Sequence, residues 1–407
     1  MDIAERRYRI VVLGAGYAGL PAAKRLARQV HRRGVEVTLI SRSPQFVERP
    51  RLHQLATGQQ VPSLELAELL GRSGARLLVG RVAALDVDRR EVLVDTDGAT
   101  HRVGYDTLVY ALGSTIDVDT VPGVRGNAHT LAGPEQAARF HARATELAGR
   151  GGQVLVCGGG LTGIEAATEI AETYPALCVE LVSLRRPGWW LAERARRHLD
   201  RALDRLDVAV HWGSSIVEVG TDAAALADGT SIRFDACLWA GGFTVPRLAR
   251  DSGLTVNGCG RIVVDRTLRS VSHRDIYAAG DAAAAAGRWG EAMAYGCRTG
   301  GFMGPYVADA VADALAGRTP RPFRFRYIHQ CVSLGRHDGL VQFVHPVDES
   351  PRRAVLTGGL AVRYKDTTLG SAIWLFRHPG PYLPRRGKPA RHTSLPDPAA
   401  SVRAVQR

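Results

Sequence analysis

Two glycine-rich turns, each between an apolar strand and a helix, constrain the fold of this chain more than any other feature. The first turn follows the apolar run 9–13 and consists of Gly14, Ala15, Gly16, Tyr17, Ala18 and Gly19. An apolar periodicity through Val30 predicts a helix after it, and the run 35–40 predicts the next strand. Glycines in this arrangement permit the tight turn, the close approach of backbone to a pyrophosphate and the packing of helix on strand. Because free N–H groups at a helix N-terminus bind anions, we expect these six residues to bind a dinucleotide.

The same arrangement occurs a second time. Residues 153–157 predict a strand, 164–170 a helix and 179–182 a further strand. The turn between the first two reads GGGLTG, and its predicted ligand contacts are Gly158, Gly160, Leu161, Thr162 and Gly163. Two complete turns predict two bound dinucleotides, since a dehydrogenase with a single cofactor needs only one.

An internal repeat accompanies the two turns. Asp-Gly pairs at 97–98 and 228–229 are hairpin signals, and similar sequences at 105–113 and 234–241 close the two β-rich stretches. A chain of 407 residues is also too long for one hydrophobic core. We therefore expect two related α/β domains, each with an added β-meander.

These features resemble the two-dinucleotide flavoproteins, in particular type II NADH dehydrogenase-like members of the FAD-dependent pyridine nucleotide-disulfide oxidoreductase superfamily. The resemblance covers about residues 9–309 and also rests on the motifs FVERPRLHQLATG, LVYALGS and DIYAAGDAA. It implies an α/β fold with two Rossmann-like, glutathione-reductase-like domains plus a C-terminal α+β segment. FAD is expected at the first turn and NADH or NADPH at the second. The domain boundaries expected from the resemblance are 1–115 and 246–320 for FAD, 116–245 for NAD(P)H and 321–407 for a C-terminal interface or membrane-associating segment.

Individual roles also follow from the resemblance. Glu165 is expected beside the flavin and nicotinamide rings as the catalytic residue, and Asp281, with Gly280, against the FAD ribityl chain. The alternatives are that Glu165 only favours the dipole of its helix, and that Asp281 caps a helix over 282–286. The remaining FAD contacts implied by the motifs are Arg51, Ala111 and Gly113.

The ends of the second strands depart from the commonest dinucleotide pattern, in which an acid binds the ribose hydroxyls. At the first turn this place is taken by Ser41 and then Arg42, so we expect these two to hold the adenosine part of FAD. At the second turn no carboxylate follows the strand, and Arg185 and Arg186 lie nearby. This suits a 2′-phosphate and favours NADPH over NADH, with a solvated arginine loop as the alternative.

The electron acceptor is less defined by the sequence. No cysteine precedes Cys157, which excludes disulfide reductase chemistry, and Leu161 stands where sulfide:quinone oxidoreductases carry a cysteine. Residues 293–300 lack the glutamines with which type II NADH dehydrogenases contact quinone, so a quinone acceptor follows from the resemblance alone. Two alternatives stay open: an FAD-dependent oxidase or dehydrogenase of specialised metabolism, and a flavin redox sensor resembling apoptosis-inducing-factor-like proteins.

The C-terminal segment combines a predicted helix over 361–376 with a basic tail, in a chain of net charge +13. Trp374 and the tail would suit an anionic membrane surface, while packing on the FAD domain or a homodimer are the alternatives. The basic residues of the tail are Arg385, Arg386, Lys388 and Arg391. No base-reading motif accompanies the charge, so nucleic-acid binding is not expected.

Cysteine and histidine usage predicts a cytoplasmic protein without a metal site. Six scattered cysteines without a C-x-x-C pair indicate a reducing compartment. His329, His337 and His345 recur every eight residues, but no partners stand at metal-ligand spacing. No run of 18 apolar residues occurs, so membrane contact, where it exists, is expected to be peripheral and on the inner face.

Overall fold

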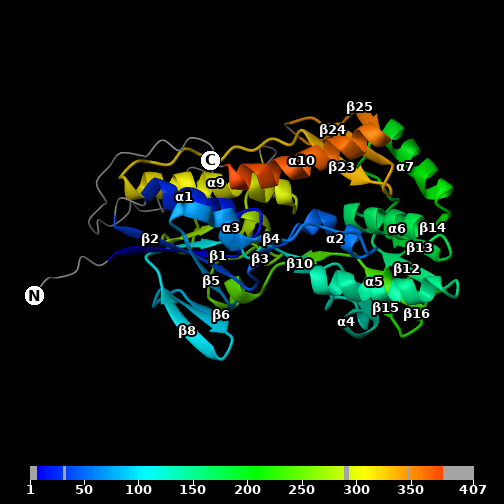
Figure 1. Cartoon of the computed structure of the whole chain (residues 1–407), viewed down its shortest axis with the longest axis horizontal. Helices are drawn as coiled ribbons and strands as arrows, with labels where there is room; N and C mark the ends of the chain where they lie inside the picture. Colours follow the sequence, from blue (N-terminus) through cyan, green and yellow to red (C-terminus); the bar gives the residue numbers. More distant parts are fainter. Residues whose placement is uncertain (1–6, 31–33, 288–292, 347, 379–407) are drawn as a thin grey trace, which may run out of the picture.

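The computed structural model describes residues 7–30, 34–287, 293–346 and 348–378, which form two lobes joined along one long axis (Figure 1). Each lobe is built on a five-stranded sheet in which every neighbouring pair of strands is parallel. Buried parallel strands of this kind read as continuous apolar runs, which is how both were recognised in the sequence. The basic tail predicted after residue 378 lies outside the described residues.

The first lobe has the strand order β21-β9-β1-β2-β5. Alternate side chains of β1 face opposite sides: Ile10 and Val12 pack with α1 and α9, while Val11 and Leu13 pack with an antiparallel meander. Glycine at position 98, with φ +90°, forms the predicted turn of that meander. The elements of this lobe are β1 (Tyr8–Leu13), α1 (Gly19–Val30), β2 (Val35–Ser41), β5 (Arg76–Val79), β6 (Arg81–Asp86), β7 (Glu91–Thr96), β8 (Ala99–Gly104), β9 (Thr107–Tyr110), β21 (Ile276–Ala278) and α9 (Cys297–Leu315).

The second lobe has the order β11-β18-β12-β13-β14 and repeats the plan of the first. Its meander turns at Gly229, with φ +86°, as predicted. Two short strands, β10 (Thr115–Ile116) and β19 (Phe243–Thr244), pair where the chain passes between the lobes. The elements of this lobe are β11 (Ala128–Thr130), α5 (Pro134–Ala148), β12 (Gln153–Cys157), α6 (Leu161–Thr173), β13 (Cys178–Ser183), α7 (Glu193–Arg205), β14 (Val208–Trp212), β15 (Ile216–Val219), β16 (Ala223–Leu226), β17 (Ser231–Arg233) and β18 (Ala236–Trp239).

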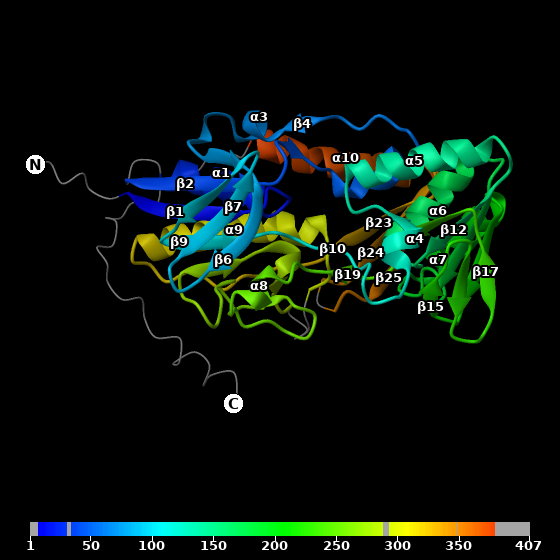
Figure 2. The same cartoon turned by 90° about the horizontal axis from the view of Figure 1, so that it is seen from below.

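The C-terminal segment is α+β, as predicted, and it contacts both lobes (Figure 2). Three antiparallel strands, β23 (His329–Ser333), β24 (Gly339–Val344) and β25 (Pro351–Thr357), precede the helix α10 (Gly359–Arg377). Val332 belongs to the core of the second lobe, whereas Phe376 belongs to that of the first. The buried Lys24 of α1 donates to the carbonyls of Leu69 and Phe376 and so fixes the end of α10.

Short elements fill the connections. They are β3 (Gln45–Phe46), η1 (Arg49–Arg51), α2 (Leu52–Leu55), β4 (Leu64–Glu65), α3 (Leu66–Leu70), η2 (Gly71–Ser73), α4 (Val124–Asn127), α8 (Leu248–Asp251), β20 (Ile262–Val263), η3 (Gly280–Ala282) and β22 (Ala283–Ala284). The alternative weighed for Asp281, a cap on an α-helix over 282–286, is wrong, because the chain enters β22 there, which pairs with β20. Within the described residues, no helix is long and apolar enough to cross a membrane.

Candidate active site

The two glycine turns have the same geometry. The Gly14 N–H donates to the carbonyl of Ile40 at 2.8 Å, and the Gly158 N–H donates to that of Val182 at 2.7 Å. Both glycines adopt positive φ, +92° and +117°, which side chains other than glycine rarely tolerate. A Cβ atom on Gly19 would overlap the Gly14 carbonyl oxygen, as one on Gly163 would overlap that of Gly158. Both turns thus begin a helix with bare backbone and fit a pyrophosphate.

Residues at the end of β9 and in α9 pack against the first glycine turn. The Ala111 N–H donates to the Leu13 carbonyl at 2.9 Å, and the Ala111 carbonyl lies against Gly14. Ala18 packs on Gly304 of α9, where a Cβ would overlap the Ala18 carbonyl. The Tyr17 ring is buried against Phe46 and Phe376, at centroid distances of 5.1 and 5.9 Å. Only the backbone of Tyr17 therefore faces the predicted ligand.

Asp281 lies in the short helical turn η3, close to the predicted FAD turn. Its Oδ2 accepts from the Ser114 hydroxyl at 2.6 Å, and its Oδ1 accepts from the Gly296 N–H at 2.8 Å. The Ser114 carbonyl in turn accepts from Arg49 Nη1 at 2.5 Å. The structure thus joins the predicted motifs around Gly113 and Gly280, both at positive φ, with the start of α9.

Three other predicted FAD contacts occupy distinct places. Ser41 ends β2 and is buried, and the Arg42 side chain reaches toward Gly133 at the start of α5. Arg51 instead pairs with Glu48 and with Asp366 of α10, both at 3.3 Å. Arg51 therefore joins the first lobe to the C-terminal helix, a contact that its sequence position gave no reason to expect.

The predicted nucleotide side of the second lobe lies at the carboxyl ends of β13 and β14. The Arg185 guanidinium stacks over the Trp189 ring at 4.6 Å, whereas Arg186 pairs with Asp200 at 2.9 Å. Ser183 is buried and its hydroxyl lies where a Cβ of Gly159 would project. The loop after β13 is therefore partly organised, by the ion pair of Arg186 and by the stacking of Arg185 on an indole ring.

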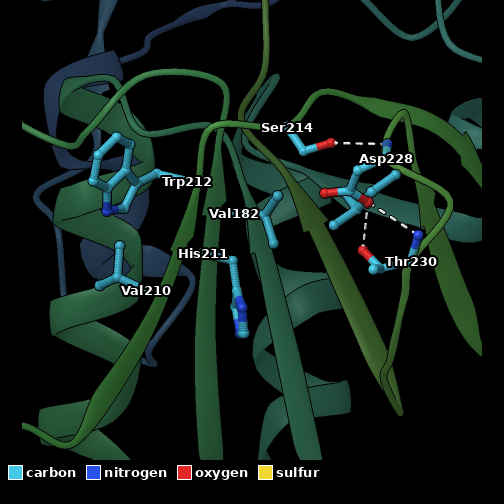
Figure 3. Close-up of a pocket in the computed structure, with 8 residues that line it drawn as sticks. Val182, Val210, His211, Trp212, Ser214, Asp228 and Thr230 are labelled. Atoms are coloured by element: carbon cyan, nitrogen blue, oxygen red, sulfur yellow. Dashed lines mark hydrogen bonds between the residues drawn. The ribbon is translucent and has the colours of Figure 1, made fainter.

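A cavity of about 320 Å³ opens beside these strand ends (Figure 3). On one side Asp228 accepts from the hydroxyl and N–H of Thr230, at 2.6 and 3.0 Å, and its own N–H donates to Ser214. The other residues that line the cavity are Val182, Val210, Trp212, Leu226 and His211, whose Nε2 lies 2.6 Å from Glu180 Oε2.

Glu165 lies on the inner side of α6, at a junction of the two lobes and the C-terminal segment. Its Oε1 accepts from the Lys365 ammonium at 2.6 Å and from the Ser333 N–H at 3.0 Å. Lys365 also donates to the Ser333 hydroxyl at 2.7 Å. Burial acts to raise the pKa of Glu165, but Lys365, His53 and these hydrogen bonds outweigh it, so the pKa lies below its ordinary value. Glu165 is therefore held as a carboxylate, which goes beyond a simple helix-dipole role.

The junction contains two further buried ionisable groups. His53 Nδ1 lies 3.7 Å from Glu165 Oε2, and His53 Nε2 lies 4.0 Å from Glu169 Oε2. Burial lowers the pKa of His53 to about 4, so its imidazole is neutral near pH 7. Burial raises the pKa of Glu169, although Gln59 and Arg336 donate hydrogen bonds to it and act in the opposite direction. The neutral imidazole of His53 thus lies between the carboxylate of Glu165 and the carboxyl group of Glu169.

A family model described as pyridine nucleotide-disulphide oxidoreductase matches residues 8–296. The chain belongs to this family. The FAD and nicotinamide nucleotide expected from the two turns are the cofactors of the family, and the chain is an oxidoreductase. The first cysteine of the chain is Cys157, and all six cysteines are free.

Individual relatives of this pyridine nucleotide-disulphide oxidoreductase agree with that assignment. An NADH dehydrogenase-like protein of Mycobacterium tuberculosis is 29% identical over 349 residues, covering 80% of this chain and 86% of the relative. The demethylphylloquinone reductase of Synechocystis is 25% identical over 419 residues, covering 94% and 99%. Among solved structures, NDH2 of Plasmodium falciparum with NADH has a TM-score of 0.78 at 14% identity, covering 91% of this chain and 96% of that one. The sulfide:quinone oxidoreductase of Aquifex aeolicus has the same TM-score at 18% identity, covering 91% of both chains. These structures confirm the predicted fold.

The sequence analysis did not identify four residues of the junction around Glu165, namely His53, Glu169, Ser333 and Lys365. Two signals were present. Glu169 stands four residues after Glu165, which places both carboxyl groups on one face of the helix. Lysine is also rare in this arginine-rich chain, and both described lysines, Lys24 and Lys365, are largely buried. Among the described residues, no group of three or more His, Cys, Asp or Glu side chains is arranged so that it could hold a metal ion.

Proposed function

We propose that this family member is an FAD-dependent NAD(P)H:quinone reductase. The observation that carries the proposal is the presence of two equivalent dinucleotide turns with the buried Glu165–Lys365 pair between the lobes that bear them. Relatives support the choice of acceptor. A type II NADH:quinone oxidoreductase of Mycobacterium tuberculosis is 27% identical over 366 residues, covering 79% of this chain and 76% of the relative. The Synechocystis relative is also named for a quinone substrate.

When bound, FAD would supply the redox chemistry, namely hydride uptake from the nicotinamide nucleotide and electron transfer to the acceptor. The chain provides binding and orientation. In this proposal the N–H groups at the start of α1 hold the FAD pyrophosphate, and Ser41 and Arg42 hold its adenosine part. Asp281, whose Oδ2 accepts from the Ser114 hydroxyl, would accept a hydrogen bond from a ribityl hydroxyl. Gly158 to Gly163 hold the nicotinamide nucleotide, and Glu165 and Lys365 place a proton-exchanging pair at the reacting end.

We infer that NADPH is the preferred donor. No carboxylate ends β13, where an acid would repel a 2′-phosphate, and the stacked Arg185 guanidinium is available to bind one. The cavity at Trp212 lies at the same strand ends and is large enough for an adenine ring. An engineered NADPH oxidase with the same fold, TM-score 0.72 at 18% identity, is described as having lost an aspartate and gained two arginines.

Anaerobic mixing tests both statements. The FAD-loaded protein should be bleached by NADPH and recoloured by a soluble quinone, and NADPH should bind at least about tenfold more tightly than NADH, which equals about 1.4 kcal/mol. Arg185→Gln should remove that preference, whereas Arg186→Gln, whose guanidinium is already paired with Asp200, should keep most of it. Bleaching by neither nucleotide would contradict the function. Equal binding of both by the unaltered chain would contradict only the choice of donor, and recolouring by oxygen but not quinone would indicate the oxidase alternative.

We further propose that α10 attaches the enzyme to an anionic membrane surface. Leu360, Trp374 and Leu375 of this helix are each more than half exposed, an arrangement suited to the headgroup boundary. The intact chain should float with vesicles containing phosphatidylglycerol, and Trp374→Ser with Leu375→Ser should reduce the bound fraction at least about threefold. The exposed Leu184→Ser, on the second lobe, is the control. Equal binding to neutral vesicles would contradict the charge dependence, and a dimer whose stability falls in the double variant would identify a homodimer interface instead.

A further inference from the structure

Buried ionisable side chains lead from Glu165 through His53 and Glu169 to Arg336, which is partly exposed to solvent. Glu169, on the next turn, has a side chain only 1% exposed, yet its Oε1 accepts from Arg336 Nε at 3.0 Å and from Gln59. The Arg336 side chain is 41% exposed. Glu169 therefore lies between solvent-facing groups and the interior, with His53 on its inner side.

The proposed reaction consumes a proton at this junction. Its balance is NAD(P)H + H⁺ + quinone → NAD(P)⁺ + quinol, so one proton per turnover comes from water. The groups proposed to exchange it, Glu165 and Lys365, have side chains only 11% exposed. A buried acceptor site of this kind needs an internal route from the surface.

We propose that His53 and Glu169 carry this proton from the surface at Gln59 and Arg336 to Glu165, an inference that rests on the proposed quinone reductase function. Glu169 gives its carboxyl proton to His53 Nε2, while the proton on His53 Nδ1 passes to Glu165 Oε2. The imidazole stays neutral and changes tautomer, and rotation of the ring with renewed protonation of Glu169 from water resets the path.

In the structure, the two nitrogens of His53 lie close to the two carboxyl groups but beyond hydrogen-bond distance. The gaps of 3.7 and 4.0 Å exceed hydrogen-bond length by about 1 Å, so a small movement of the ring or of a carboxyl group closes each of them. His53 Nε2 is buried and has no hydrogen-bond partner within the described part of the chain. A buried nitrogen without a partner is costly and needs an explanation, and a part-time donor on Glu169 provides one.

The charges around His53 suit a neutral carrier. Glu165 favours its protonation, whereas Lys365 from α10, Arg51 from its own segment and Arg336 from the β23–β24 turn oppose it, and burial exceeds them all. The low pKa of His53 keeps the imidazole from holding a proton, and burial raises the pKa of Glu169, which favours protonation of its carboxyl group.

Separating the two half-reactions of the FAD-loaded protein tests the relay. Hydride transfer from NADPH needs no proton uptake, so His53→Gln should leave its rate within about twofold. Quinone reduction should slow by about tenfold or more, with an increased solvent isotope effect, and Glu169→Gln should do the same. His198→Gln, which alters a partly buried histidine of α7 that is paired with Asp338, should change neither rate.

A second measurement does not depend on turnover. In the FAD-loaded protein with ¹³C-labelled histidine, the ring signal missing from His53→Gln should show no protonation from pH 8 down to about 5, because the pKa of His53 is about 4. Titration of that signal near 6.5, an unchanged rate of quinone reduction in both variants, or equal slowing of both half-reactions would each overturn the relay. Should His53→Gln fail to fold, Glu169→Gln decides alone. Failure of the unaltered protein to reduce any quinone would instead overturn the proposed function.

Discussion

Replacing Gly163 with valine should abolish reduction by NADPH and NADH while FAD remains bound. A Cβ atom at this position overlaps the Gly158 carbonyl oxygen, so the turn has to open and its N–H groups no longer point at one anion. Losing two hydrogen bonds to a charged group costs roughly 3 to 6 kcal/mol. We therefore expect the Kd of both nucleotides to rise by about 100-fold or more.

The equivalent substitution in the first turn gives the opposite pattern. Gly19→Val should yield a protein purified without its yellow colour, since the same overlap occurs with the Gly14 carbonyl. Gly301→Ala is the matched control, because a Cβ there meets no atom within 4 Å and its φ is not positive. Absorbance at 450 nm and titration of nucleotide fluorescence measure the two losses. Normal FAD content in Gly19→Val, or normal nucleotide binding in Gly163→Val, would show that the turn concerned is not the binding site.

Lys365→Met should lower the free energy of unfolding by about 3 to 5 kcal/mol at pH 7, because it leaves the buried Glu165 carboxylate without its cation. The double variant Glu165→Leu with Lys365→Met should lose much less, since replacing a whole buried ion pair with apolar groups is often close to neutral. Urea unfolding of the unaltered chain, Glu165→Leu, Lys365→Met and the double variant measures the coupling directly. Additive losses would mean that the two side chains do not form a pair.

The pH dependence of this effect has a definite sign. The pKa of Glu165 in the native protein lies below its ordinary value of 4.5, so the pair contributes stability above about pH 4.5 and loses it as the pH falls through the native pKa. In Lys365→Met burial raises that pKa instead, and acidification neutralises the stranded carboxylate. The difference between the unaltered chain and the variant should therefore be largest near neutral pH and shrink below about pH 5. A difference that grows on acidification would contradict the assignment.

The sequence predicted those parts of the structure that depend on neighbouring residues. The glycine turns were found because each places strand, turn and helix within about twenty residues, and the bounds of β12 agree residue for residue. Asp281 shows the limit of local reasoning. Its run of alanines is compatible with a helix, but Gly280 at φ +68° and the pairing of β20 with β22 lead the chain into a strand.

The junction around Glu165 could not be predicted from the sequence, because its residues are far apart along the chain. Ser333 and Lys365 approach Glu165 from 168 and 200 residues away, and no periodicity in the chain relates these positions. His53 lies in a motif that was recognised only as a whole. The structure adds what the motif conceals, namely that one ring nitrogen faces each of two carboxyl groups of α6.

The helix α10 has a mechanical consequence for this enzyme. Its Lys365 is anchored to the second lobe through Glu165, and its last turn is anchored to the first lobe through Lys24 and the packing of Phe376. Because α10 is a continuous helix fixed to both lobes, it resists changes in the distance between them. Nucleotides are therefore expected to enter and leave by rearrangement of the β13–α7 loop, with the donor-to-acceptor spacing unchanged, rather than by swinging of one half of the molecule away from the other.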